Sequence, residues 1–82
     1  MKRENIVKLE EITSDYLGIN RNIVKEDSSY YKDLDADSFD VANIIIEYEM
    51  CFNINIPYVF SKNILRIKDV IEYIDKNYKN KF

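Results

Sequence analysis

The sequence contains no histidine and only one cysteine, Cys51. Histidine is the usual general base of hydrolytic triads and the commonest zinc ligand, so its absence argues against serine triads, thiol–imidazole pairs and nearly all zinc sites. A single cysteine excludes a disulfide within the chain. Because Cys51 lies in an apolar helical pattern, we expect a buried, unreactive thiol. The chain is therefore not expected to be an enzyme with its own active site.

Glycine and proline occur once each, at Gly18 and Pro57, which leaves few sharp turns and favours helices. No apolar run is long enough to cross a bilayer, and residues 1–5 lack the apolar core of a signal peptide. We therefore expect a cytoplasmic protein without a membrane partner. A chain of 82 residues has room for one small core, so a single domain over residues 1–82 is predicted.

Charge is distributed unevenly along the chain, whose net charge is -3. Residues 29–60 carry one basic and six acidic side chains, whereas residues 61–82 carry six basic and three acidic ones. The acidic middle argues against nucleic acid as the main partner and favours a basic protein surface. We interpret the basic end as a solvated helix face.

Apolar periodicity predicts helices over residues 3–17, 38–52 and 66–79, with a short helix over 58–63. Residues 53–57 alternate as a strand would, but no second strand is evident, so we predict an extended connector. The predicted fold class is all-α, a small bundle of three main helices plus one short helix.

The first predicted helix ends at Gly18, which supplies a left-handed C-cap. Periodicity then fails over residues 20–34, a loop long enough in so small a domain to suggest function. Apolar residues spaced along this loop are predicted to anchor it on the core: Ile23, Val24, Tyr30 and Leu34.

Four aspartates and one serine lie within eight residues at the start of the second predicted helix: Asp33, Asp35, Asp37, Ser38 and Asp40. Ser38 is predicted to be the N-cap, with Asp37 and Asp40 suiting the positive end of the helix dipole. On this local pattern alone, a well-capped helix start is favoured. The alternative is an exposed, modified serine surrounded by acids that a basic partner recognises.

The spacing of Asp33, Asp35 and Asp37 also imitates a calcium-binding loop. An EF-hand needs glycine and glutamate where this chain has Ser38 and Ile44, so no metal site is expected.

Two apolar faces run along the second predicted helix. One comprises Val41, Ile44, Ile45, Tyr48 and Phe52, and the other Phe39, Ala42, Ile46 and Met50. A helix this apolar is usually buried. In so small a domain, however, one face is expected to stay exposed beside carboxylates, as on a partner-binding helix.

Taken together, these segments resemble the acyl carrier protein family over almost the whole chain. The resemblance depends on Leu17-Gly18-Ile19, Tyr30-Tyr31-Lys32-Asp33-Leu34, Asp35-Ala36-Asp37-Ser38-Phe39-Asp40, Phe52 before Ile56-Pro57, and Val70-Ile71-Glu72-Tyr73-Ile74. The aspartate–serine motif alone is weak, but its combination with the downstream Ile-Pro and the closing helix is specific.

The resemblance implies that Ser38 receives 4′-phosphopantetheine from coenzyme A through a Mg²⁺-dependent phosphopantetheinyl transferase, the holo-carrier synthase. The thiol of this arm would carry acyl groups as thioesters between the acyl-loading and acyl-processing enzymes of fatty acid or specialised acyl or polyketide biosynthesis. Separately from the resemblance, a monomer is the default expectation, and a weak dimer through Phe39, Ile46 and Met50 is the alternative. The implied partner-binding residues are Asp33, Asp35, Asp37, Phe39, Asp40, Ala42, Ile46, Glu49 and Met50. The residues implied to line an acyl chain are Ile45, Tyr48, Ile64 and Ile71.

The chain departs from the family pattern in several places. Phe39 replaces the usual leucine, Asp35 replaces the usual glycine, and Asn43, Met50 and Cys51 stand where acids are common. This more apolar partner face suggests a carrier for one specialised acyl or aminoacyl pathway. Two alternatives remain open: an aminoacyl, peptidyl or D-alanyl-type carrier, and an interaction module that keeps the fold without the arm.

Overall fold

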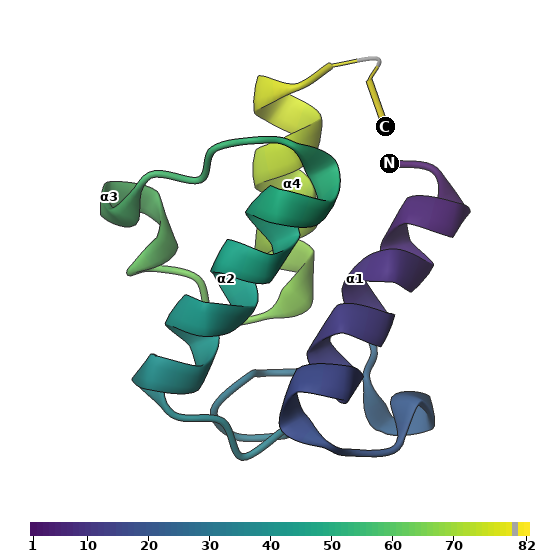
Figure 1. The fold of residues 1–82 in the computed structure, drawn as a ribbon, viewed down its shortest axis with the longest axis vertical. Coiled ribbons are helices and arrows are strands. Elements are labelled where there is room, and N and C mark those ends of the chain that lie inside the picture. The colour runs from purple at the N-terminus through teal and green to yellow at the C-terminus, as the bar shows by residue number, and fades with distance from the viewer. Residues whose placement is uncertain (80) are drawn as a thin grey trace.

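The structure is a computed structural model that describes residues 1–79 and 81–82. Its elements are α1 (Arg3–Leu17), the 3-10 turn η1 (Arg21–Ile23), α2 (Ser38–Phe52), α3 (Tyr58–Ser61) and α4 (Ile67–Asn77). Three long helices pack together, and the short α3 lies to one side of α2 (Figure 1). Among the described residues there is no strand, only an isolated bridge between Ser29 and Arg66. The all-α prediction is confirmed.

Helix α1 ends as its sequence predicts. Gly18 has a φ of 66°, in the left-handed region that costs glycine nothing, and its N–H donates to the Ser14 carbonyl. The Ile19 N–H donates to the same carbonyl at 3.1 Å. Ile19 then packs against the core, so the chain is folded back on the last turn of α1.

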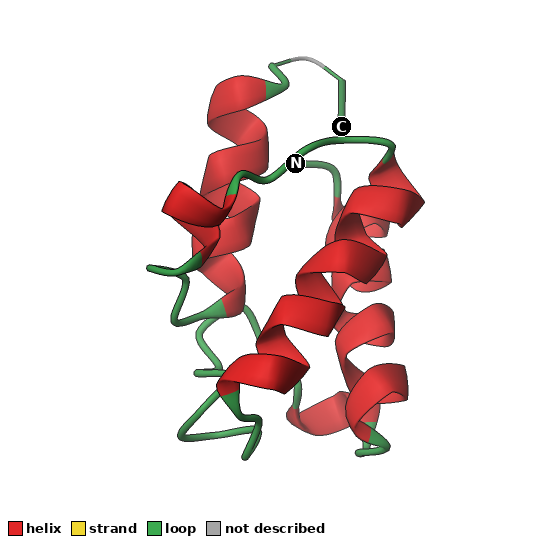
Figure 2. Cartoon of the chain, turned by 60° about the vertical axis from the view of Figure 1, so that its left-hand side comes forward, coloured by secondary structure: helices red, strands yellow, loops and turns green. Residues whose placement is uncertain are grey.

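The core is built around α2, which stands at the front of the bundle in Figure 2. The buried side chains of α2 are Val41, Ile44, Ile45, Tyr48 and Phe52, the face that the i, i+3, i+4 spacing predicts. Leu9 of α1 and Val70 and Ile74 of α4 belong to the same buried cluster. The apolar stripes of three helices thus share one core.

The loop from residue 19 to residue 37 crosses one end of the bundle (Figure 1). Val24, Tyr30 and Leu34 are buried, as predicted for anchors. The prediction for Ile23 is wrong, because this residue ends η1 and its side chain is 52% exposed while the following Val24 turns inward.

The connector between α2 and α3 is extended, as predicted. Asn53 ends α2 with a φ of 54°, a left-handed conformation that asparagine tolerates, and the Ile54 N–H donates to the Glu49 carbonyl at 3.1 Å. The Glu49 carboxylate accepts from the Ile56 N–H at 2.7 Å. Helix α3 is two residues shorter than predicted, ending at Ser61.

Helix α4 spans Ile67–Asn77, slightly shorter than the predicted 66–79. Its start is fixed by the Asp69 carboxylate, which accepts hydrogen bonds from the Leu65 and Arg66 N–H groups at 3.0 and 2.9 Å. In the described part of the chain, no helix has the length and apolar character needed to cross a membrane.

Candidate functional site

Ser38 is the first residue of α2 and is exposed. The sequence predicts Ser38 as the N-cap, and this is wrong: the cap is Asp37, whose carboxylate accepts from the Asp40 N–H at 2.8 Å. The Asp40 carboxylate accepts in return from the Asp37 N–H at 3.1 Å, which completes a capping box. Asp37 can cap because its backbone is extended, whereas Ser38 already has helical geometry. The capping role therefore falls to a neighbour, and the serine side chain stands at the surface.

The turn before Ser38 contains a left-handed residue, Asp35, with a φ of 57°. Aspartate is one of the few residues other than glycine that adopt this conformation at modest cost. The turn is closed by the Ala36 N–H, which donates to the Tyr30 carbonyl at 2.9 Å, and Ala36 itself is buried. Asp35 can therefore adopt the left-handed conformation at the position where the resemblance predicts glycine.

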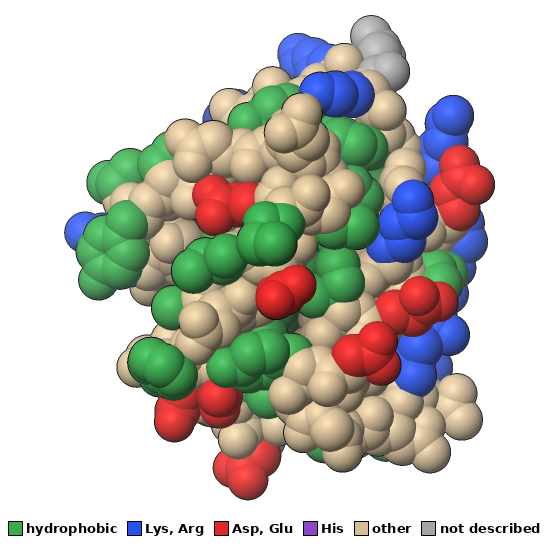
Figure 3. Space-filling view, viewed as in Figure 1, with side chains coloured by type: hydrophobic (Ala, Val, Ile, Leu, Met, Phe, Trp, Pro, Cys, Tyr) green, Lys and Arg blue, Asp and Glu red, His purple; other side chains and the backbone are tan. Residues whose placement is uncertain are grey.

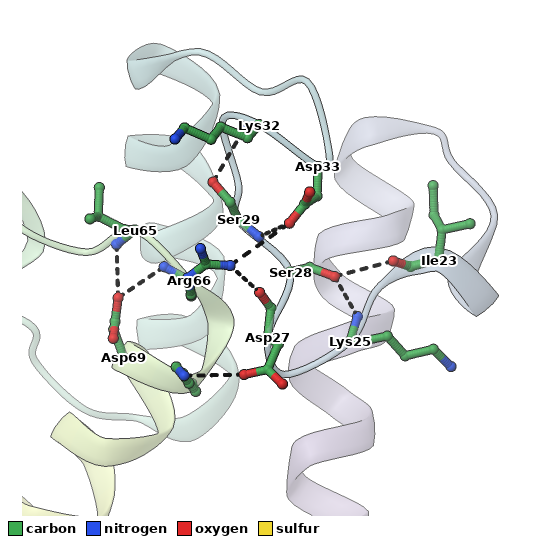
Figure 4. Close-up of polar contacts among 11 residues, drawn as sticks. Ile23, Lys25, Asp27, Ser28, Ser29, Lys32, Asp33, Leu65, Arg66 and Asp69 are labelled. Atoms are coloured by element: carbon green, nitrogen blue, oxygen red, sulfur yellow. Dashed lines mark hydrogen bonds and ion pairs between the residues drawn. The ribbon is translucent and has the colours of Figure 1, made fainter.

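Polar contacts tie the loop before Ser38 to the start of α4 (Figure 4). The Arg66 guanidinium donates to the Asp27 carbonyl at 2.5 Å and lies 3.9 Å from the Asp33 carboxylate. Asp33 in turn accepts from the Ser29 N–H at 2.7 Å. The Tyr30 N–H donates to the Leu65 carbonyl at 3.0 Å. Side chains and backbone together hold this loop, and so the turn that carries Ser38, against α4.

A cleft of about 160 Å³ opens beside Ser38, between α2 and α3. Its lining residues come from the loop, α2 and the α3 region: Tyr31, Ser38, Val41, Ala42, Ile45, Tyr58, Ser61 and Lys62. Lys62 is the cation in this set, and most of the other lining side chains are apolar or aromatic. Of the residues implied to line an acyl chain, the cleft includes Ile45.

A second exposed feature is an apolar surface on α2 and α3, here called the α2–α3 surface. It comprises Phe39, Ala42, Ile46 and Met50 of α2 with Tyr58 and Val59 of α3. Phe39 and Met50 are 73% and 71% exposed. Figure 3 shows hydrophobic side chains over both helices, with acidic side chains near the start of α2 and others among the hydrophobic ones further along it. The predicted exposed face of α2 is therefore confirmed.

The acids predicted to bind partners have different surroundings. Asp35 and Asp37 are exposed, although Asp37 serves the capping box with Asp40. Asp33 is bonded within the loop, and Glu49 holds the connector. No three histidine, cysteine or acidic side chains converge to hold a metal ion within residues 1–79 and 81–82.

The prediction of a buried thiol is wrong, because Cys51 is exposed. In the last turn of α2, the side chains of Tyr48 and Phe52 are buried in the bundle. Cys51 lies on the exposed part of the same turn, next to the exposed Met50. The apolar pattern of α2 extends around more of the helix than the rest of the bundle covers.

A chain of hydroxyl groups crosses the core beneath α2. The Tyr48 hydroxyl lies 2.5 Å from Thr13 Oγ1 and 2.9 Å from the Tyr30 hydroxyl, and Thr13 donates to the Leu9 carbonyl at 2.8 Å. Burial raises the pKa of Tyr48 to about 12 and that of Tyr30 well above its ordinary value. The sequence analysis did not predict these hydrogen bonds between hydroxyl groups. The one indication of them was Thr13, a residue with a hydroxyl group within the apolar stripe of α1.

Sequence comparisons with known proteins show which proteins this chain is similar to. No protein-family model matches the chain. It is 36% identical over 75 residues to the acyl carrier protein of Rubrobacter xylanophilus, covering 90% of this chain and 93% of that protein. It is 38% identical over 69 residues to the acyl carrier protein of Wolinella succinogenes, with coverage of 84% and 91%. It is 32% identical over 71 residues to that of Syntrophobacter fumaroxidans, with coverage of 87% and 88%.

Proposed function

Because the chain belongs to the acyl carrier protein family, we propose that Ser38 carries a 4′-phosphopantetheine arm and that the protein passes acyl groups between enzymes. Members of this family are carriers rather than enzymes. The observation that carries the proposal is that Ser38 is exposed, begins α2 and borders the α2–α3 cleft. When bound, the arm supplies a terminal thiol that holds acyl groups as thioesters.

The residues around Ser38 fit a phosphodiester that continues into a flexible chain. The first turn of a 15-residue helix offers backbone N–H groups and the positive end of its dipole to a phosphate. Lys62 adds a cation to the cleft wall, and Tyr31, Val41 and Ile45 add apolar surface. The cleft beside Ser38 therefore combines positive charge with apolar contact area.

Attachment would form a bond between Ser38 Oγ and the phosphorus next to the pantetheine, while the pyrophosphate bond of coenzyme A breaks and adenosine 3′,5′-bisphosphate leaves. The serine proton must be taken up by a base. The chain has no histidine, and the neighbouring carboxylates of Asp37 and Asp40 bond each other's N–H groups. We therefore assign the base, like the Mg²⁺, to the transferase. What this chain contributes is a serine held on a rigid helix start.

We propose that the transferase and the acyl-processing enzymes dock on the α2–α3 surface. Exposed apolar side chains such as Phe39 and Met50 would supply contact area, and Asp35 and Asp37 would steer a basic partner. A carrier must leave each enzyme quickly, which suits a small docking area. We further propose that the protein acts as a cytoplasmic monomer.

The apolar character of this surface favours a specialised acyl or aminoacyl pathway over general fatty acid synthesis. Replacing Asn43 and Met50 with glutamate would restore acids where the family commonly has them. The double variant is expected to be turned over faster by fatty acid enzymes than the natural protein. No gain in turnover would count against a specialised role.

The test of attachment is the intact mass of the protein after incubation with coenzyme A, Mg²⁺ and a promiscuous phosphopantetheinyl transferase. Ser61→Ala is the matched control for Ser38→Ala, because both serines line the same cleft. Ser38 begins α2, whereas Ser61 ends α3. One added arm is expected on the natural protein and on Ser61→Ala, and none on Ser38→Ala. Folded protein that gains no mass would favour the interaction module without an arm.

A further inference from the structure

We propose that this carrier holds short acyl or aminoacyl groups at the cleft beside Ser38 and does not enclose a long acyl chain in its helical core. The inference rests on the proposed function and adds a substrate class to it. Three features carry it: the chain of hydroxyl groups under α2, the size of the cleft and the packing of the side chains between them.

The hydroxyl chain has a defined direction. Thr13 has one hydroxyl hydrogen and donates it to the Leu9 carbonyl, so its oxygen accepts from Tyr48. The Tyr48 oxygen then accepts from the Tyr30 hydroxyl at 2.9 Å. Within the described residues, no buried side-chain nitrogen or oxygen lacks a partner. These hydrogen bonds thus join α1, the loop and α2, and each of the three hydroxyl groups has a hydrogen-bond partner.

Tyr48 follows Ile45, which lines the cleft, by one turn on the buried face of α2. Both Tyr48 and Tyr30 are 0% exposed. An acyl chain that extended past Ile45 along this face would have to displace the Tyr48 ring. Such a chain has no hydrogen-bonding group, so it would leave the Tyr30 and Thr13 hydroxyls buried with fewer partners. Apolar side chains can be displaced by an acyl chain without this loss.

The cleft offers room for a small cargo. Its volume is about 160 Å³, close to that of an apolar cavity of about 150 Å³ that holds one benzene-sized molecule of roughly six heavy atoms. Ile64 and Ile71, implied by the family resemblance to line an acyl chain, are 1% and 7% exposed and belong to the same packed cluster as Tyr48. The structure therefore provides room for a small group near Ser38, with a closed core behind it.

The experiment compares thioesters of different length on Ser38. The transferase is supplied with acetyl-, hexanoyl- or dodecanoyl-coenzyme A, loading is read as added mass, and thioester cleavage by hydroxylamine is timed for each. Burial would protect the thioester in proportion to the closed population. We expect the three cleavage rates to agree within about twofold and Tm to be independent of chain length. Dodecanoyl cleavage about tenfold slower than acetyl cleavage, with a raised Tm, would overturn the inference.

A second arm tests whether Tyr48 is the barrier. Tyr48→Leu combined with Tyr30→Phe removes both tyrosine hydroxyls and the ring that fills the core. The folded double variant is expected to protect a dodecanoyl thioester that the natural protein leaves accessible, whereas Tyr16→Leu, on the outer side of α1, should not. A folded double variant without this gain would overturn the role of Tyr48. The comparison of acetyl, hexanoyl and dodecanoyl thioesters on the natural protein tests the substrate class independently of this variant. Failure to load any thioester is a separate result, seen as unchanged mass, and would overturn the proposed function.

Discussion

The Asp37 carboxylate accepts from the Asp40 N–H at 2.8 Å, and the Asp40 carboxylate accepts from the Asp37 N–H at 3.1 Å. This reciprocal pair flanks Ser38 and holds the first turn of α2 from both sides. Its carboxylates also lie where the helix dipole favours negative charge. The acids of the motif therefore have a structural role besides any attraction of a basic partner.

Removing this cap should destabilise the protein and disturb Ser38. Asp37→Ala is expected to lower the free energy of unfolding by about 1 kcal/mol, because the Asp40 N–H loses its acceptor. Loading of Ser38 should slow as the first turn frays. Urea unfolding gives the stability, and Asp37→Asn, which keeps a side-chain oxygen, is the control with a smaller loss. Unchanged stability of Asp37→Ala would contradict the role of the cap.

Asp35 offers a test of backbone conformation. Its φ of 57° suits glycine, so Asp35→Gly should fold with equal or slightly greater stability. Asp35→Val places a β-branched residue in the left-handed region and should cost about 1–2 kcal/mol. Thermal and urea unfolding compare the two variants. Equal stability of the glycine and valine variants would show that this turn does not require the left-handed conformation.

Alkaline pH should destabilise the fold through the buried tyrosines. Burial raises the pKa of Tyr48 from 10.0 to about 12, so above pH 10 the folded state keeps a phenolic proton that the unfolded state loses. The stabilising contribution is complete below pH 10 and is lost as the pH rises toward 12. Tyr30, whose pKa is also raised, acts in the same direction. Urea unfolding below and above pH 10 should show this fall in stability.

Tyr48→Phe separates the hydroxyl chain from simple packing. The variant should lose about 1–3 kcal/mol at neutral pH, because it leaves the Tyr30 hydroxyl buried without its acceptor. The fall in stability above pH 10 should also become shallower. Tyr58→Phe is the control, since Tyr58 is 78% exposed. Identical pH profiles for natural protein and Tyr48→Phe would contradict the assigned cause.

The α2–α3 surface predicts which substitutions weaken partners without weakening the fold. Phe39→Ala and Met50→Ala should change stability by no more than about 0.5 kcal/mol, because both side chains are largely exposed. Each should nevertheless raise the KM for loading, at a cost of more than about 1 kcal/mol. Ile23→Ala, an exposed apolar residue on η1, is the matched control. An unchanged KM for both α2 variants would exclude this surface from transferase binding.

The helices could be predicted from the sequence because their signals are local. The apolar stripe of α2 fixes its bounds at residues 38 and 52, and Gly18 ends α1 where a left-handed residue is needed. The N-cap was misassigned because Asp37 and Ser38 are both good caps, and the choice depends on which residue is extended. Local pattern does not contain that information.

Other features depend on contacts between distant segments. The outward turn of Ile23 and the exposure of Cys51 follow from how much of the surface the bundle covers, which periodicity does not reveal. The Tyr30–Tyr48 hydrogen bond joins residues 18 positions apart, and Thr13 lies 35 positions from Tyr48. A sequence pattern can suggest that each residue is buried, but their meeting requires the tertiary structure.

The measurement that tests the central claim most directly is the site of modification after expression with a phosphopantetheinyl transferase. Trypsin cleaves after Lys32 and Lys62, so one peptide contains both Ser38 and Ser61. Fragmentation of that peptide should place the whole 4′-phosphopantetheine group on Ser38 and leave Ser61 unmodified. An arm on Ser61, or an unmodified peptide from folded protein, would contradict the assignment of Ser38 as the carrier serine.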